Sequence, residues 1–154
     1  MPVTTIVSGG QTGADRAALD VALECGLGIG GWVPKGRRAE DGTIPERYTG
    51  LRETDSDEAA VRTALNVRDS DATLIVSHGP LGGGSLLTLH EANRLGRPVL
   101  HLDLSLLEAE RAVSALRQWL RAVDPRTLNV AGPRGSEDPA IGENVGALLR
   151  AVLR

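Results

Sequence analysis

A short β-branched segment that runs into a glycine-rich turn and then into a helical pattern occurs three times in this sequence. The three copies span residues 4–25, 72–95 and 127–153. A strand, a turn and a helix in that order form the first half of a βαβ crossover, the connection that joins parallel strands. The repetition therefore restricts the chain to folds in which helices connect the strands of a parallel sheet.

Four further elements lie between the three copies. Strands are predicted at 28–33 and 98–102, and helices at 56–69 and 106–123. The last of these carries an apolar stripe at three- and four-residue spacing, formed by Leu106, Ala109, Val113, Leu116, Leu120 and Val123. Capping boxes are predicted for Thr12 with Asp15 and for Ser105 with Glu108. The pattern predicts a Rossmann-like, doubly wound α/β fold with a mostly parallel sheet of about five strands and helices on both faces.

Length and composition limit the class of protein further. The 154 residues fit a single ligand-binding domain spanning 1–154. An aromatic fraction of 2% and a net charge of −3 argue against a nucleic-acid binder, which needs stacking rings and positive charge. The single cysteine, Cys25, excludes an internal disulfide, and no segment has the length of a membrane span or the pattern of a targeting peptide. We expect a soluble cytoplasmic protein without a membrane partner.

The polar segment 34–55 is the longest stretch without a helical or strand pattern. It is rich in glycine, proline and charge. Because a structureless loop of about twenty residues is uncommon inside a compact domain, we expect it to be a lid or a binding loop.

Ligands of an open parallel sheet bind beyond the carboxyl ends of its strands, and the three glycine-rich turns all lie at that edge. A helix that starts there offers unpaired N–H groups and the positive end of its dipole to an anion. The candidate ligand-binding residues in two of these turns are Gly9, Gly10, Gln11, Thr12 and Gly13, and Gly82, Gly83, Gly84 and Ser85. Glycines also simply make turns, so one such loop would be weak evidence, whereas several at one edge favour an anion site.

Basic residues follow the second predicted strand. Lys35, Gly36 and Arg37 begin the long loop, and Lys35 is the only lysine in the chain. Arg16 and Arg134 lie in or beside two of the glycine-rich segments and add positive charge. Short basic runs are most often solvated surface, but their position at this edge indicates complementarity to a phosphate or another oxyanion.

Other chemistries have less support. The run Gly26–Gly30 resembles a dinucleotide fingerprint but precedes a strand instead of following one. Glu40 and Asp41 are typical of a solvated loop pair. The three histidines, His78, His90 and His101, are too scattered to suggest a structural metal site. His78 is the one beside a glycine loop, where it is a candidate acid or base.

Several long motifs resemble one known family. They are Ser8-Gly9-Gly10-Gln11-Thr12-Gly13-Ala14-Asp15-Arg16, then the run from Gly31 to Gly42, then Arg62-Thr63 with Asn66-Val67-Arg68-Asp69-Ser70-Asp71, and finally Leu128 to Arg134. They are similar to the putative molybdenum carrier family, whose members resemble molybdenum cofactor carrier proteins. The family lies in a Rossmann-like superfamily that also includes lysine-decarboxylase-like phosphoribohydrolases.

The resemblance implies binding and protective carriage of molybdenum cofactor (molybdopterin), or of a related anionic, phosphate-bearing ligand, without catalysis. Molybdoenzymes would be the recipients, and a homo-oligomer is compatible with such a carrier. The implied alternatives are a nucleotide-binding sensor and a nucleotide-processing enzyme such as an N-glycosidase. In the phosphoribohydrolases a catalytic Glu follows the glycine motif, where this chain has Thr88, with Glu91 one turn later. The glycosidase chemistry would therefore lack its expected acid at this position. Thr88 is a further ligand-binding candidate, and Glu91, Glu53 and Asp15 are the acid–base candidates of an enzyme.

Overall fold

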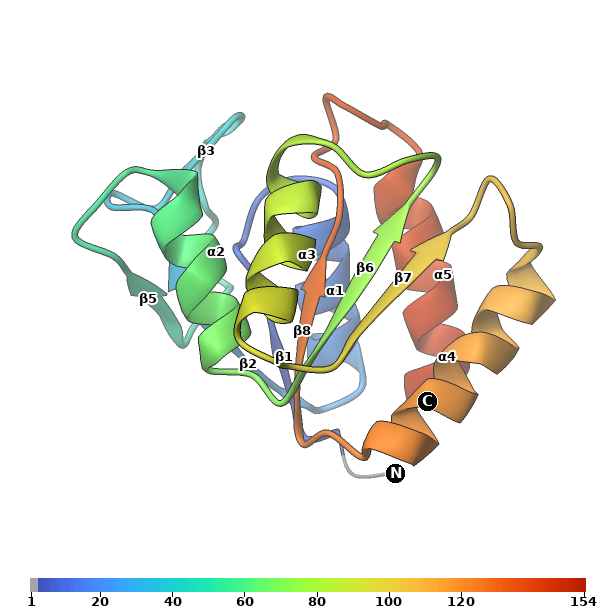
Figure 1. Ribbon diagram of the computed structural model, residues 1–154. Helices are drawn as coiled ribbons and strands as arrows, with labels where there is room; N and C mark the ends of the chain where they lie inside the picture. The colour runs from blue at the N-terminus through green and yellow to red at the C-terminus, as the bar shows by residue number, and fades with distance from the viewer. Residues whose placement is uncertain (1–2) are drawn as a thin grey trace.

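The computed structural model describes residues 3–154 and contains a three-layer arrangement of helices around a parallel sheet (Figure 1). The elements are β1 (Thr5–Val7), α1 (Ala14–Glu24), β2 (Gly28–Val33), β3 (Arg38–Ala39), β4 (Gly42–Thr43), β5 (Leu51–Glu53), α2 (Ala59–Arg68), β6 (Ala72–Ser77), α3 (Gly83–Arg94), β7 (Val99–Asp103), α4 (Ala109–Val123), β8 (Thr127–Ala131) and α5 (Ile141–Leu153).

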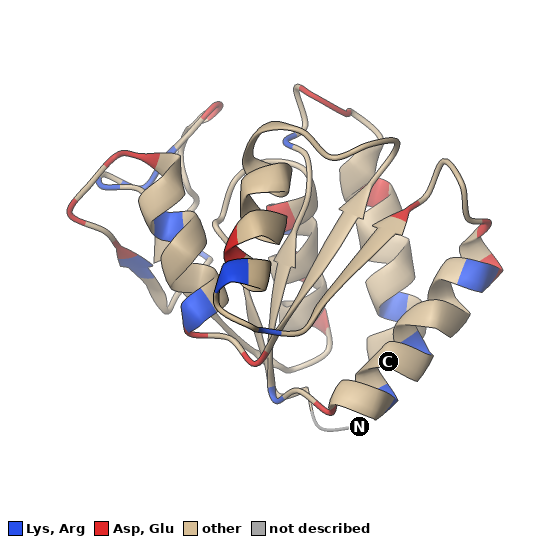
Figure 2. Cartoon of the chain, viewed as in Figure 1, with Lys and Arg blue, Asp and Glu red and all other residues tan. Residues whose placement is uncertain are grey.

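Six strands form the main sheet in the order β5-β2-β1-β8-β6-β7, and every pairing in it is parallel. In the centre, Ile6 of β1 lies opposite Leu128 of β8 on one side and Ile29 of β2 on the other. The central strands β1, β6 and β8 carry no charged residue (Figure 2), as expected for parallel strands covered on both faces. The predicted Rossmann-like α/β fold is confirmed.

The two faces of the sheet differ in character. Helices α1, α4 and α5 cover one face, and the large apolar core lies beneath them, with Ile6, Leu74, Leu116 and Leu128 among its fully buried members. Helices α2 and α3 cover the other face (Figure 1).

Beneath α2 and α3 the sheet buries several polar side chains beside Ile75. Thr73 and Ser77 alternate with the core residues of β6, and Asn129 does so on β8. These polar groups are paired: Asn129 Nδ2 donates to Thr73 Oγ1 at 3.3 Å, and the Ser77 hydroxyl lies 2.7 Å from His101 Nε2. A buried polar group costs stability unless it is hydrogen-bonded, and these pairs meet that condition.

The segment 34–55, predicted to be a loop, contains three short strands. β3 and β4 form an antiparallel hairpin, and β5 pairs with β2 as the sixth strand and one edge of the main sheet. A second, smaller cluster, formed by Leu19, Val33, Ile44 and Tyr48, fixes this segment against α1 and β2. β5 was not predicted because its three residues, Leu-Arg-Glu, are too few to show the alternating pattern of a strand.

Both predicted capping boxes are wrong. Gly13 is the N-cap of α1 and Glu108 that of α4, and neither helix has a side-chain cap. The hydroxyl of Ser105 bonds Asp103 instead, so α4 begins at Ala109 rather than at Leu106. Leu106 is consequently outside the helix and 82% exposed, and the buried stripe of α4 is formed by Ala112, Leu116 and Leu120.

Smaller corrections concern the other helix starts. α2 begins at Ala59 instead of 56, and α3 begins at Gly83, so two glycines assigned to a loop form its first turn. Within residues 3–154, no helix is both long and apolar enough to cross a membrane.

Candidate functional site

A cavity of about 380 Å³ opens at the carboxyl ends of the central strands, where the chain crosses from one half of the sheet to the other. We call it the sheet-edge cavity. Its lining comes from the loops after β1, β2 and β8, the first turn of α1, the β3–β4 hairpin, α2 with the turn before it, and the first two turns of α3. Gly83 and Gly84 belong to the lining, and its polar and charged residues are Gln11, Asp15, Arg38, Glu40, Asp57, Arg62, Thr63, Ser85, Thr88, Arg134 and Glu137.

Arg62 on α2 supplies a partly buried guanidinium group to this cavity. Its Nε is buried and has no hydrogen-bond partner among residues 3–154. Its terminal nitrogen Nη1 lies against Gly9 so closely that a Cβ on that glycine would overlap it. Gly9 therefore makes room for the arginine, and the guanidinium remains available to an anion in the cavity.

Asp15, in the first turn of α1, is the buried acid of the cavity and is only 7% exposed. Its Oδ2 accepts a hydrogen bond from the backbone N–H of Gln11 at 3.1 Å. Burial raises the pKa of this carboxyl to about 6, although the positive charge of Arg62 and the Gln11 bond oppose the shift. A carboxyl that titrates near neutrality beside an arginine is a feature of functional sites.

The start of α3 provides the open helix terminus. Gly82 is its N-cap, without a side-chain cap, so the first N–H groups of the helix have no partner within it. Gly83, Gly84 and Ser85 of this turn line the cavity, and Ser85 is 8% exposed. The hydroxyl of Thr88 bonds back to the carbonyl of Gly84 at 2.9 Å, which orients it along the helix.

The loop from Gly9 to Gly13 differs from α3 in this respect. The N–H of Gly10 donates to Ser8 Oγ, that of Gln11 to Asp15, and that of Ala14 to the carbonyl of Pro133. These three donors are used inside the protein, so the loop before α1 offers fewer N–H groups to a ligand than its glycine-rich sequence indicates. Of the five predicted residues in this loop, Gln11 is the one that lines the cavity.

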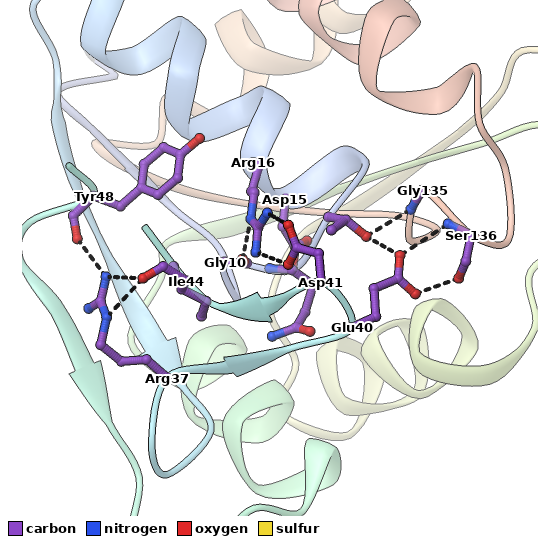
Figure 3. A network of polar contacts seen from close by, with 12 residues as sticks. Gly10, Asp15, Arg16, Arg37, Glu40, Asp41, Ile44, Tyr48, Gly135 and Ser136 are labelled. Carbon is purple, nitrogen blue, oxygen red and sulfur yellow. Dashed lines mark hydrogen bonds and ion pairs between the residues drawn. The ribbon is translucent and has the colours of Figure 1, made fainter. Parts of the chain in front are cut away.

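The predicted basic residues have different environments. Arg37 adopts a left-handed backbone with φ 54° and donates to the carbonyls of Ile44 and Tyr48 (Figure 3). It also donates to the carbonyl of Pro45. Arg16 donates to the carbonyl of Gly10 and forms a bidentate ion pair with Asp41.

Lys35 and Gly36 lie outside the lining of the cavity and are exposed, whereas Pro34 and Arg38 belong to it. The structure therefore does not bring Lys35, Arg37 and Arg16 together around one ligand position. Their binding role stays a prediction.

The acids of the hairpin tip are exposed, as the sequence indicated, but each also has specific partners. Glu40 accepts hydrogen bonds from the hydroxyl of Thr12 and from both the N–H and the hydroxyl of Ser136 (Figure 3). Asp41 pairs with Arg16. The tip is thus attached to α1 and to the loop after β8 by specific contacts.

A second cavity of about 520 Å³ adjoins the first and shares Gly83, Ser85 and Glu137 with it. His78 lines it, with Nδ1 against the carboxylate of Asp138 and Nε2 2.9 Å from the amide nitrogen of Asn144. Both ring nitrogens are therefore engaged by protein groups.

The remaining acid candidates lie outside both cavities. Glu91 pairs with Arg94 on the surface of α3, and Glu53 accepts from the N–H of Gly36 at 2.7 Å. In the described part of the chain, no group of three or more His, Cys, Asp and Glu side chains could hold a metal ion. Of the three acids proposed for an enzyme, Asp15 is the one in the sheet-edge cavity.

Sequence reasoning missed Arg62, Arg38 and Glu40 as cavity residues. Arg62 lay inside a motif used for the resemblance, but its helical position gave no sign that it pointed to the sheet edge. Arg62 lies more than fifty residues from Gly9 in sequence. Its position at the sheet edge follows from its contact with Gly9, which no local pattern indicates.

Comparison with known proteins identifies the family of the chain. The model of the circularly permutated YpsA SLOG family matches residues 6–153. The crystal structure of a putative molybdenum carrier protein from Syntrophus aciditrophicus SB has a TM-score of 0.97 and 47% sequence identity, covering 99% of this chain and 96% of that one. No curated protein matches the sequence significantly. These matches confirm the resemblance indicated by the motifs.

Proposed function

The chain belongs to the circularly permutated YpsA SLOG family, and we propose that it binds and carries a small anionic, phosphate-bearing ligand of the molybdenum cofactor type without transforming it. The support for a molybdenum-related ligand comes from the 47% identical structure, whose name is that of a putative molybdenum carrier protein. The support for an anionic ligand comes from the chemistry of the sheet-edge cavity.

The observation that carries the proposal is the guanidinium of Arg62. Its Nε is buried in the wall of the cavity without a partner in residues 3–154. A buried donor that lacks a partner costs roughly 1–3 kcal/mol, and more when it is charged, so a protein keeps one where a ligand supplies the acceptor. Arginine presents its donors in a fork that matches the oxygens of phosphate.

The first turn of α3 complements this arginine from another wall. The N–H groups of Gly83, Gly84 and Ser85 and the positive end of the helix dipole favour a negative group. Arg38 and Arg134 add positive charge to the lining, where Arg134 also pairs with Glu137 at 3.2 Å. Nucleotides fit this donor set as well. In the carrier function, residues 1–154 act as one cytoplasmic ligand-binding domain that delivers the ligand to molybdoenzymes, as a monomer or a homo-oligomer.

A thermal-shift screen tests this function. The ligands are molybdate, tungstate, inorganic phosphate, nucleotides and molybdenum cofactor itself. A ligand that binds the folded state alone stabilises it by about 2.7 kcal/mol at a hundred times its Kd, which raises the Tm of a chain this long by roughly 5–11 °C.

Arg62→Ala should lose most of this shift. Arg111→Ala is the matched control, because Arg111 is exposed on α4, away from the cavity. An unchanged Tm with every anionic ligand, or equal shifts in the wild-type chain and Arg62→Ala, would overturn the proposal.

A nucleotide-processing enzyme is the second candidate, and Asp15 is the observation that favours it. Its carboxyl, with a pKa of about 6, can hold or release a proton near neutral pH inside a cavity that also contains Arg62. Incubation with a panel of nucleoside monophosphates, followed by chromatography for free base or free phosphate, separates the two functions. Product formation that Asp15→Asn abolishes would establish the enzyme, and no product with bound ligand would establish the carrier.

A further inference from the structure

The carboxylate of Glu40, at the tip of the β3–β4 hairpin, lies in a small pocket of hydrogen-bond donors. The backbone N–H of Ser136 donates to its Oε1 at 3.1 Å, and the Ser136 hydroxyl donates to its Oε2. The hydroxyl of Thr12 donates to Oε1 as well (Figure 3). Two elements distant in sequence, the loop before α1 and the loop after β8, thus supply three donors to one carboxylate.

The orientation of the Thr12 hydroxyl is fixed by its other partner. The backbone N–H of Gly135 donates to Thr12 Oγ1 at 3.0 Å. Since this oxygen accepts from Gly135, its own proton is directed at Glu40. The Thr12 donor is therefore oriented by a residue outside the hairpin. We call the Thr12 hydroxyl with the Ser136 N–H and hydroxyl the Thr12–Ser136 pocket.

The surroundings of this pocket favour negative charge. The hydrogen bonds from Ser136 and Thr12 lower the pKa of the Glu40 carboxyl, and the charge of Arg134 acts in the same direction. Each of these groups would act in the same way on a phosphate oxygen, because backbone N–H, hydroxyl and guanidinium donors recognise oxyanions in general.

The hairpin that carries Glu40 also borders the ligand cavity. Glu40 and Arg38 line the sheet-edge cavity together with Arg62, Ser85 and Arg134. The hairpin is held at its tip by Glu40 and by the exposed ion pair of Asp41 with Arg16. Exposed carboxylates contribute little net stability through such contacts, so a stronger anion can replace one of them.

We propose that the Thr12–Ser136 pocket is an oxyanion subsite that the Glu40 carboxylate occupies in this structure, and that a phosphate or other tetrahedral oxyanion of the ligand displaces Glu40 and frees the β3–β4 hairpin. A phosphate monoester carries more charge than a carboxylate and a third acceptor oxygen, which favours it in the exchange. This inference rests on the proposed function, since it concerns an additional position in the same cavity.

Glu40→Ala tests the exchange directly, with inorganic phosphate as the probe in isothermal titration calorimetry. Removing the internal competitor should make phosphate bind about two- to fivefold more tightly than to the wild-type chain, the range expected when an exposed charged contact no longer competes. Glu46→Ala is the matched control, because Glu46 is exposed in the same segment and does not line the cavity. It should leave the affinity unchanged.

Ser136→Ala in the Glu40→Ala background identifies the subsite. Two of the three donors belong to Ser136, and the substitution removes its hydroxyl, so the gain in affinity should largely disappear. In the wild-type chain, hydrogen exchange at residues 38–43 should become faster when phosphate is added, because the ligand releases the hairpin tip.

The outcomes separate this inference from the proposed function. If Glu40→Ala binds phosphate no more tightly than the wild-type chain, or if Ser136→Ala leaves its gain intact, the subsite is refuted. Loss of binding in Arg62→Ala would still uphold the proposed function in that case. If Glu40→Ala gains affinity while Arg62→Ala binds normally, the subsite stands and the assigned role of Arg62 fails. If neither protein binds phosphate, the subsite is refuted and the ligand screen decides the function.

Discussion

Replacement of Gly9 by alanine should weaken anion binding without destabilising the protein. The new Cβ would overlap Nη1 of Arg62 and come within 3.0 Å of Asp15 Oδ2. Gly9 does not have a positive φ, so alanine can adopt its backbone conformation. The group that must move is the end of a flexible side chain, and the guanidinium therefore shifts out of its position in the cavity wall.

The expected change in the Kd for phosphate follows from the free energy of the hydrogen bond between the guanidinium and the anion. A hydrogen bond to a charged group is worth about 1.5–3 kcal/mol, which corresponds to roughly a 10- to 150-fold increase in the Kd for phosphate. Replacement of glycine by alanine also stabilises a chain by about 0.4–1 kcal/mol through its unfolded state, which offsets the cost of moving Arg62. We expect the Tm to change by less than about 4 °C.

Gly132→Ala is the matched comparison, because its Cβ would meet rigid groups instead of a flexible end. It would lie 2.5 Å from the carbonyl oxygen of Val76 and 2.7 Å from the Cβ of Ala14. Such overpacking costs about 1–3 kcal/mol, or roughly 2–12 °C in Tm for a chain this long. Differential scanning fluorimetry and phosphate titration of both variants check the contrast. If Gly9→Ala lowers Tm as much as Gly132→Ala and keeps its affinity, the placement of Arg62 is refuted.

Three further substitutions test the electrostatics and the packing. Because burial raises the pKa of Asp15 to about 6, its contribution to stability is greatest below pH 4 and is lost as the pH rises through 6. Compared with the wild type, Asp15→Asn should therefore gain up to roughly 3 kcal/mol in its free energy of unfolding between pH 4 and pH 7.5, as measured by urea denaturation. An equal difference between variant and wild type at both pH values would contradict this. Asn66→Ala removes the side chain that bonds both the N–H and the carbonyl of Trp32, at 2.6 and 3.0 Å, and should cost about 2–3 kcal/mol, whereas Asn93→Ala, on the exposed side of α3, should cost less than about 0.5 kcal/mol. Lys35→Ala should weaken phosphate binding less than Arg62→Ala does and leave Tm unchanged, because its exposed ammonium group is screened by solvent; an unaltered Kd would make Lys35 a plain surface charge.

The sheet could be predicted from the sequence because its signals are local. The β-branched runs at 72–77 and 127–131 and the glycine turns after them each carry their own period and breakers, and both strands appear at those positions. The predicted helix starts were less accurate than the predicted strands, because the first turns of α1 and α4 depend on tertiary contacts. The hydroxyl of Thr12 bonds Glu40 and Ser105 bonds Asp103, so neither was available as a cap.

The candidate site was predictable in location but less so in composition. Topology alone placed the glycine turns at one edge of the sheet, where the sheet-edge cavity lies. Which cation enters the cavity depends on packing across the sheet, and Arg37 shows the difficulty. Its position in a basic run indicated a ligand contact, yet its guanidinium binds three carbonyl groups of its own segment. Nothing in the local sequence distinguishes such an arginine from Arg62.

The polar pairs beneath α2 and α3 have a consequence for how the protein opens. Neither helix contributes to the two apolar clusters, so this layer is held by less hydrophobic burial than the opposite one. Its amides should exchange through partial unfolding at a lower free energy than those of α1 and α5. Because Arg62 and the first turn of α3 both belong to this weaker layer, a bound anion would slow exchange there most, and amide protection would report occupancy even without a visible change in shape.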